Sequence, residues 1–163
     1  MYAASVPVFT RFLTALSGVL TKAENHVEAQ GIKPEALLGF RLYPDMLPFT
    51  RQVQLTTDFA TRGADRLTGR EVRSFPDTET DFAGLRARLA GAADYLAGFT
   101  PAEFEGAETR EVVLTLRNGE MRMPGAQFLE AYAKPQFFFH MTTAYDILRH
   151  NGVVLGKRDF MGA

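Results

Sequence analysis

The chain has 163 residues, a formal net charge of −1, 46% hydrophobic residues and 23% charged residues, which predicts one soluble globular domain with a sizeable core. The near-neutral charge and the absence of a Lys/Arg cluster argue against nucleic acid or a membrane surface as a partner. The chain contains no cysteine, which excludes disulfides, thiolate nucleophiles and cysteine-ligated zinc. With no signal peptide or uncharged membrane span in its first residues, we expect a cytoplasmic protein.

Residues 4–30 carry apolar side chains at spacings of three and four, which predicts one long amphipathic helix. Pro7 is tolerable there only in the first turn, where the backbone N–H has no partner anyway. Gly31 is a natural stop. Residues 31–39 then form a connector, with one short helical turn that begins at Pro34.

A second long helix is predicted over 47–67, with Asp45 as its N-cap residue and Pro48 in its first turn. Residues 70–77 read as a loop. A third helix follows over 78–98, where apolar residues again share one side.

The hydrophobic period then changes from helical to alternating. Residues 110–117 and 120–123 flank Asn118-Gly119, a dipeptide typical of the type I′ turn of a β-hairpin. An isolated hairpin is only marginally stable, so this one should pack on the helices or on a second copy of the chain.

The last helix is predicted over 125–150, with a kink or break near 131–135 because Pro135 removes a backbone hydrogen bond. We expect an irregular tail with four apolar residues available to pack back on the bundle: Val153, Val154, Leu155 and Phe160. The prediction is therefore a single all-α domain over 1–163, a four-helix bundle with a small β-hairpin inserted before its last helix.

Polar side chains interrupt the apolar faces of two of these helices. Gln136, His140 and Thr143 share one side of the last helix, and Gln52 and Thr56 share one side of the second. If both stripes face inward, they meet either as a closed hydrogen-bond network or as a small-molecule or metal pocket.

The three histidines are too few and too scattered for an obvious metal site. His140 and His150 lie ten residues apart on one helix, about 15 Å along its axis, and His26 can reach at most one of them. A catalytic metal usually takes three protein ligands, so His140 reads first as a structural histidine. His150 suits the C-terminal end of a helix, and His26 reads as a flanking residue.

The carboxylates have ordinary explanations. Asp58 has Arg62 four residues on, and Asp146 has Arg149 three residues on and His150 four on, which is typical of pairs on a helix surface. No nucleophilic serine motif, phosphate-binding loop or dinucleotide fingerprint is present. The sequence alone does not decide whether the chain is an enzyme.

Several long stretches nevertheless resemble a known family: MYAASVPVF, RLYPDMLPFTRQVQ, the hairpin, and FFFHMTTAYDILRHNGVVLGKRDF. Over essentially the whole chain they resemble an uncharacterised bacterial family of the DinB/YfiT-like superfamily. The resemblance implies a four-helix bundle, usually dimeric. In better-known relatives three histidines bind a divalent metal, and some members are thiol-dependent transferases or isomerases.

That metal site carries over only in part. The resemblance places the second histidine of the last-helix motif on His140 and the first on Gln136, a poor metal ligand. The third histidine has no counterpart between Asp45 and Gln52.

The first hypothesis is therefore a homodimeric bundle without a resident cofactor. It would bind a small molecule in a polar pocket formed by Gln52, Gln136, His140, Asp45 and Thr143. The second is a transferase or hydrolase that uses Zn, Ni or Fe held by His140 with Asp45 or His26. The third is a purely structural or interaction protein.

Overall fold

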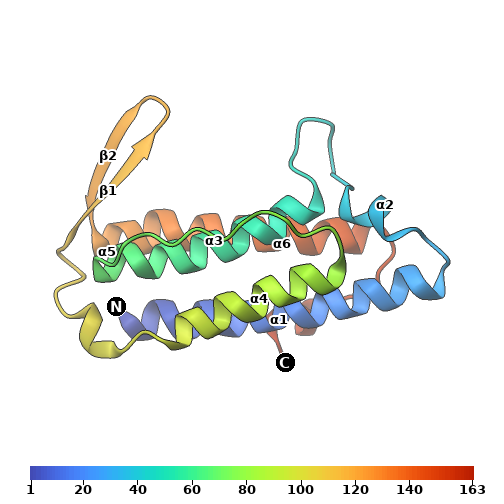
Figure 1. Cartoon of the computed structure of the whole chain (residues 1–163), viewed down its shortest axis with the longest axis horizontal. Coiled ribbons are helices and arrows are strands. Elements are labelled where there is room, and N and C mark those ends of the chain that lie inside the picture. Colours follow the sequence, from blue (N-terminus) through green and yellow to red (C-terminus); the bar gives the residue numbers. More distant parts are fainter.

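Four long helices form the bundle in a computed structural model that describes the whole chain, residues 1–163 (Figure 1). They are α1 (Tyr2–Ala29), α3 (Phe49–Thr68), α4 (Phe82–Ala97) and α6 (Lys134–His150). The shorter elements are α2 (Pro34–Leu38), a 3₁₀ helix (Pro101–Phe104), β1 (Glu111–Leu116), β2 (Gly119–Pro124), α5 (Gly125–Phe128), a π-helical turn (Leu129–Ala133) and α7 (Lys157–Met161). The all-α bundle with an inserted hairpin is confirmed.

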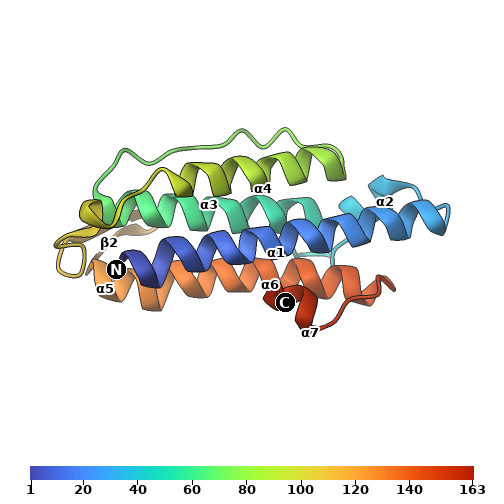
Figure 2. The same ribbon diagram turned by 90° about the horizontal axis from the view of Figure 1, so that it is seen from below.

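The helices pair in two layers, α3 with α6 and α1 with α4 (Figures 1 and 2). α3 and α4 run in the same direction, because residues 69–81 return along the whole bundle before α4 begins. An extended segment of this length spans up to about 43 Å, whereas α3 is about 30 Å long. The connection is therefore long enough to cover the groove between α3 and α4.

The core is built by the apolar stripes that the helical spacing predicts. On α1, Phe9, Leu13, Leu16 and Leu20 are completely buried. α1 is long and apolar enough to cross a membrane by length and composition alone, but this stripe packs inside the bundle. The three successive phenylalanines of α6 point to different sides, since Phe137 is fully buried and Phe139 is 59% exposed.

Two predictions about helix starts are wrong. α1 begins at Tyr2, so Pro7 lies inside the helix beyond its first turn. The N-cap of α3 is Pro48 and makes no side-chain cap, whereas Asp45 is exposed in the preceding turn. The start of α3 is fixed by tertiary contacts instead, because its first residue, Phe49, donates its N–H to the Phe40 carbonyl at 2.8 Å.

α4 starts four residues later than its spacing predicts, at Phe82. Its N-cap Asp81 accepts a hydrogen bond from the Gly84 N–H at 2.6 Å. Residues 78–81 do not join the helix; Glu79 instead contacts Arg88 at 3.1 Å.

The hairpin lies where predicted, with its tip shifted by one residue. Leu116 pairs with Gly119, so the turn is formed by Arg117 and Asn118. Asn118 does not take a positive φ; only Gly119 does, at 129°, so the expected type I′ turn is wrong. Buried side chains near the base of the hairpin, including Leu114, anchor it to the helices.

The predicted disturbance near Pro135 takes the form of a π-helical turn over Leu129–Ala133. One extra residue per turn relieves the clash of the proline ring with the preceding turn, so the helix bulges and continues. The tail is not irregular, because α7 packs Phe160 against Phe12 at a ring-centroid distance of 5.7 Å. Val153 and Leu155 are buried as expected, but Val154 is 80% exposed.

Candidate functional site

The polar stripes of α3 and α6 meet at one direct contact. His140 is 7% exposed and Gln52 is 2% exposed, and the His140 Nδ1 lies 2.7 Å from the Gln52 Oε1. The Gln52 Nε2 donates to the Leu47 carbonyl at 3.1 Å, which fixes the orientation of the amide. The stripes therefore converge as the sequence predicts.

This contact determines which nitrogen of the neutral ring carries the hydrogen. An amide oxygen only accepts hydrogen bonds, so the His140 Nδ1 must carry a hydrogen. In the neutral form of the ring, Nε2 is then the nitrogen that carries the lone pair. No protein group bonds Nε2, and the atom is not sealed from solvent, because every fully enclosed side-chain nitrogen or oxygen in the chain has a partner.

The surroundings of His140 keep its ring neutral. Burial lowers the pKa of His140 from 6.5 to about 4, and the positive charge of Arg51 adds to the effect. The ring stacks on Phe59 with centroids 5.5 Å apart and an interplanar angle of 9°, and Phe139 meets it edge-on at 5.2 Å. His140 is thus a hydrogen-bond acceptor throughout the physiological pH range.

The other predicted pocket residues contribute less. Gln136 is partly exposed and its side chain makes no hydrogen bond within the chain. Thr143 is buried and donates to the Phe139 carbonyl at 2.7 Å, and Thr56 donates in the same way to the Gln52 carbonyl at 2.8 Å. Asp45 is exposed in its turn. The site at this level is therefore the Gln52–His140 pair, with Gln136 one helical turn away.

The donor set around His140 does not fit a three-ligand metal centre. No group of three His, Asp or Glu side chains in the chain is arranged to hold a metal ion, and the Gln52 oxygen already accepts from the ring. His26 lies beside Gly152, twelve residues beyond His140 on the chain and about 18 Å along the helix direction. His150 occupies the last turn of α6, as expected.

Five cavities lie at the protein surface, and none of them is lined by Gln52, Gln136 or His140. One of these cavities is lined by Phe59, the ring on which His140 stacks. It has a volume of about 170 Å³ and lies between α3, the hairpin and the π-helical turn. Its lining residues are Leu55, Asp58, Phe59, Arg62, Gly63, Arg66, Leu114, Phe128 and Tyr132.

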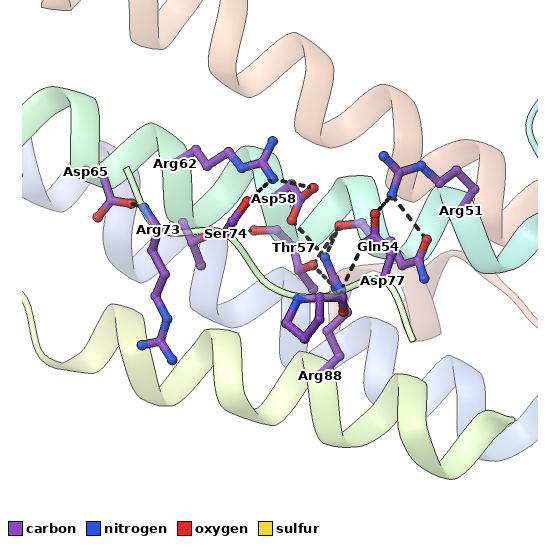
Figure 3. Close-up of polar contacts among 12 residues, drawn as sticks. Arg51, Gln54, Thr57, Asp58, Arg62, Asp65, Arg73, Ser74, Asp77 and Arg88 are labelled. Carbon is purple, nitrogen blue, oxygen red and sulfur yellow. Dashed lines mark hydrogen bonds and ion pairs between the residues drawn. The ribbon is translucent and has the colours of Figure 1, made fainter. Parts of the chain in front are cut away.

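A second polar cluster, which the sequence does not reveal, lies under residues 69–81 (Figure 3). Its centre is Arg88 of α4, whose side chain is 1% exposed. The guanidinium donates to Thr57 Oγ1 at 2.6 Å, Asp58 Oδ1 at 2.8 Å and the Pro76 carbonyl at 2.9 Å. It also lies 3.1 Å from Glu79 and 3.1 Å from Asp77.

Asp58 is therefore not the ordinary surface partner of Arg62 that the sequence predicts. It is 2% exposed and pairs with Arg62 at 3.1 Å as well as with Arg88. Burial raises the pKa of Asp58, while the two arginines lower it. Asp146 departs from its predicted role too, because it is exposed and forms no ion pair with Arg149.

The same connection is anchored again two turns along α3 from Asp58. Asp65 is completely buried and accepts from the Arg73 backbone N–H at 2.9 Å and from the Tyr95 hydroxyl at 2.7 Å. Asp65 and Arg88 were both missed at the sequence level. Their burial could have been inferred from the sequence, because both lie among apolar residues at helical spacing. A charge buried at such a position is costly unless it is paired.

Comparison with known proteins agrees with this architecture. Residues 1–161 match a family described as a domain of unknown function (DUF1993). The crystal structure of a DinB family member protein from Shewanella denitrificans is 39% identical, with a TM-score of 0.94 over 99% of this chain and 92% of that chain. No curated protein matches the chain.

Proposed function

Because the chain belongs to the uncharacterised DUF1993 family and has the DinB-like fold, we propose that it is a small-molecule-binding helical bundle whose site is the outer face between α3 and α6. The observation that carries the proposal is the orientation of His140. Gln52 holds the ring as the Nδ1–H tautomer. The Nε2 atom of His140 is left without a protein partner.

A ligand that donates a hydrogen bond would complete this arrangement. A nitrogen lone pair beside aromatic rings is a specific acceptor, since a polar group that approaches it loses water and needs the bond. Phe59 and Phe139 supply the apolar surroundings. Gln136 of the same helix face adds an amide that is not engaged within the chain.

The test is a fragment screen by ligand-observed NMR on the wild-type chain and on His140→Gln. Fragments that bind the wild type and lose binding in His140→Gln are expected, whereas His150→Gln, a substitution on the last turn of the same helix, should leave them unchanged. Hits that bind all three proteins equally would contradict a site at His140.

A metal-dependent transferase or hydrolase is the second candidate. One feature favours it: metal-ligating histidines are usually held by a hydrogen bond on their other nitrogen, as Gln52 holds His140 here. The residues around the ring argue against it, since the one side chain hydrogen-bonded to His140 is the amide of Gln52. Elemental analysis of protein purified without chelator separates the two, because near one equivalent of zinc, nickel or iron that disappears in His140→Ala would favour the enzyme.

We further propose that the chain is a cytoplasmic homodimer. Residues 40–48 and the hairpin project from the bundle on the same side, beyond the layer formed by α3 and α6 (Figure 1). Each of these parts carries an exposed apolar side chain: Tyr43 in residues 40–48 is 65% exposed, Met121 in the hairpin 40% and Phe139 on α6 59%. Light scattering should give twice the chain mass, and a monomer would refute the proposal.

A further inference from the structure

Two guanidinium groups line the cavity between α3, the hairpin and the π-helical turn. Arg62 and Arg66 lie one turn apart on α3 and both border it. The only carboxylate in the lining is Asp58, and it is already engaged, by Arg62 at 3.1 Å and by Arg88 at 2.8 Å. The cavity therefore carries more positive than negative charge.

Arg66 has no acidic partner within the chain. Its one side-chain hydrogen bond is made to the Arg62 carbonyl of its own helix, at 3.3 Å. The nearest buried carboxylate on α3, Asp65, is occupied by Arg73 and Tyr95. Burial and the neighbouring Arg62 lower the pKa of Arg66. The desolvation of a half-buried, unpaired cation costs free energy. An anion bound in the adjacent cavity would offset this cost.

The remaining walls are aromatic and apolar. The Phe128 and Tyr132 rings are stacked with centroids 5.8 Å apart, and Phe59 meets Tyr132 edge-on at 6.2 Å. Tyr132 belongs to the π-helical turn, and such turns are frequent at functional sites. Leu114 of the hairpin closes the cavity from the other side.

We propose that this cavity binds a small organic carboxylate with a flat apolar body, and that Arg66 is its principal counter-ion. A guanidinium offers the paired donors that fit a carboxylate, and the rings of Phe59, Phe128 and Tyr132 accept the apolar part. The volume of about 170 Å³ is below the range of drug-sized pockets, so the ligand is the size of a substituted benzoate or smaller. This inference goes beyond the proposed function, because it depends on Arg66 and the cavity and not on His140.

The experiment compares benzoate with benzamide, which has nearly the same shape but no charge. Amide chemical shifts of the ¹⁵N-labelled chain are followed during titration with each probe. Benzoate should bind at least about tenfold more tightly than benzamide, because a charge-assisted hydrogen bond contributes that much. The shifts should centre on the cavity lining, including Gly63, Leu114 and Phe128.

Substitutions at Arg66 decide whether its charge is responsible. Arg66→Gln should abolish the preference for benzoate, Arg66→Lys should keep it, and Arg149→Gln, at an exposed arginine of α6, should have no effect. Arg66→Gln should also fold with an unchanged or higher Tm, since it removes a desolvated cation that has no partner. Equal binding of the two probes by the wild type, a preference for benzoate that survives Arg66→Gln, inorganic phosphate that binds as tightly as benzoate, or shifts outside the cavity would each overturn the proposal.

Discussion

Replacement of Arg88 by methionine is the sharpest test of the buried network under residues 69–81. Arg88→Met keeps most of the apolar stem and removes only the guanidinium. Asp58, which is 2% exposed, then retains a single partner, Arg62, whose side chain is 33% exposed. The Pro76 carbonyl also loses its donor.

Removal of one partner from a buried ion pair costs about 3–5 kcal/mol. This cost is a large part of a typical stability of about 5–15 kcal/mol. In a domain of this size it corresponds to a Tm decrease of about 6–20 °C. Residues 76–79 should also become more susceptible to proteinase K, because Pro76, Asp77 and Glu79 each contact Arg88.

The assay is urea unfolding followed by circular dichroism, with Arg86→Met as the matched control. Arg86 lies on the same helix and pairs with Glu24, but the two side chains are 28% and 38% exposed, so the control should cost about 0–1 kcal/mol. If Arg88→Met costs no more than Arg86→Met, the network does not stabilise the fold and the reasoning is refuted.

Two further predictions concern a titrating group and a glycine. The pKa of His140 is lowered to about 4 in the folded chain. Below pH 6.5 the unfolded chain therefore takes up a proton that the folded chain does not. The free energy of unfolding should fall between pH 6.5 and pH 4, by about 3 kcal/mol at most. Unfolding of the wild type and of His140→Gln across this range measures the difference, and parallel curves would contradict it. Gly125→Ala should destabilise by about 3 kcal/mol, because the added Cβ would collide with the Ala107 carbonyl oxygen. Gly18→Ala meets no atom within 4 Å in mid-helix and should stabilise by about 0.5–1 kcal/mol; calorimetric melts that gave both variants the same sign would refute this contrast.

Local periodicity was enough to predict the four long helices, the hairpin and the disturbance at Pro135. Each of these features follows from residues close together in the chain, since helix and strand periods and the geometry of proline act over a few positions. The convergence of Gln52 and His140 was also predictable, because two polar stripes on amphipathic helices must meet once their apolar faces pack together.

Only the tertiary structure decided how residues 69–81 are used. This segment has no periodicity, so nothing in its sequence shows that it returns along the bundle and covers the groove between α3 and α4. That covering removes Asp58, Asp65 and Arg88 from water, and burial changes their roles from surface charges to mutual partners. The same holds for Arg66, because an arginine on a helix face becomes an anion-binding candidate only when the hairpin and the π-helical turn enclose the space beside it.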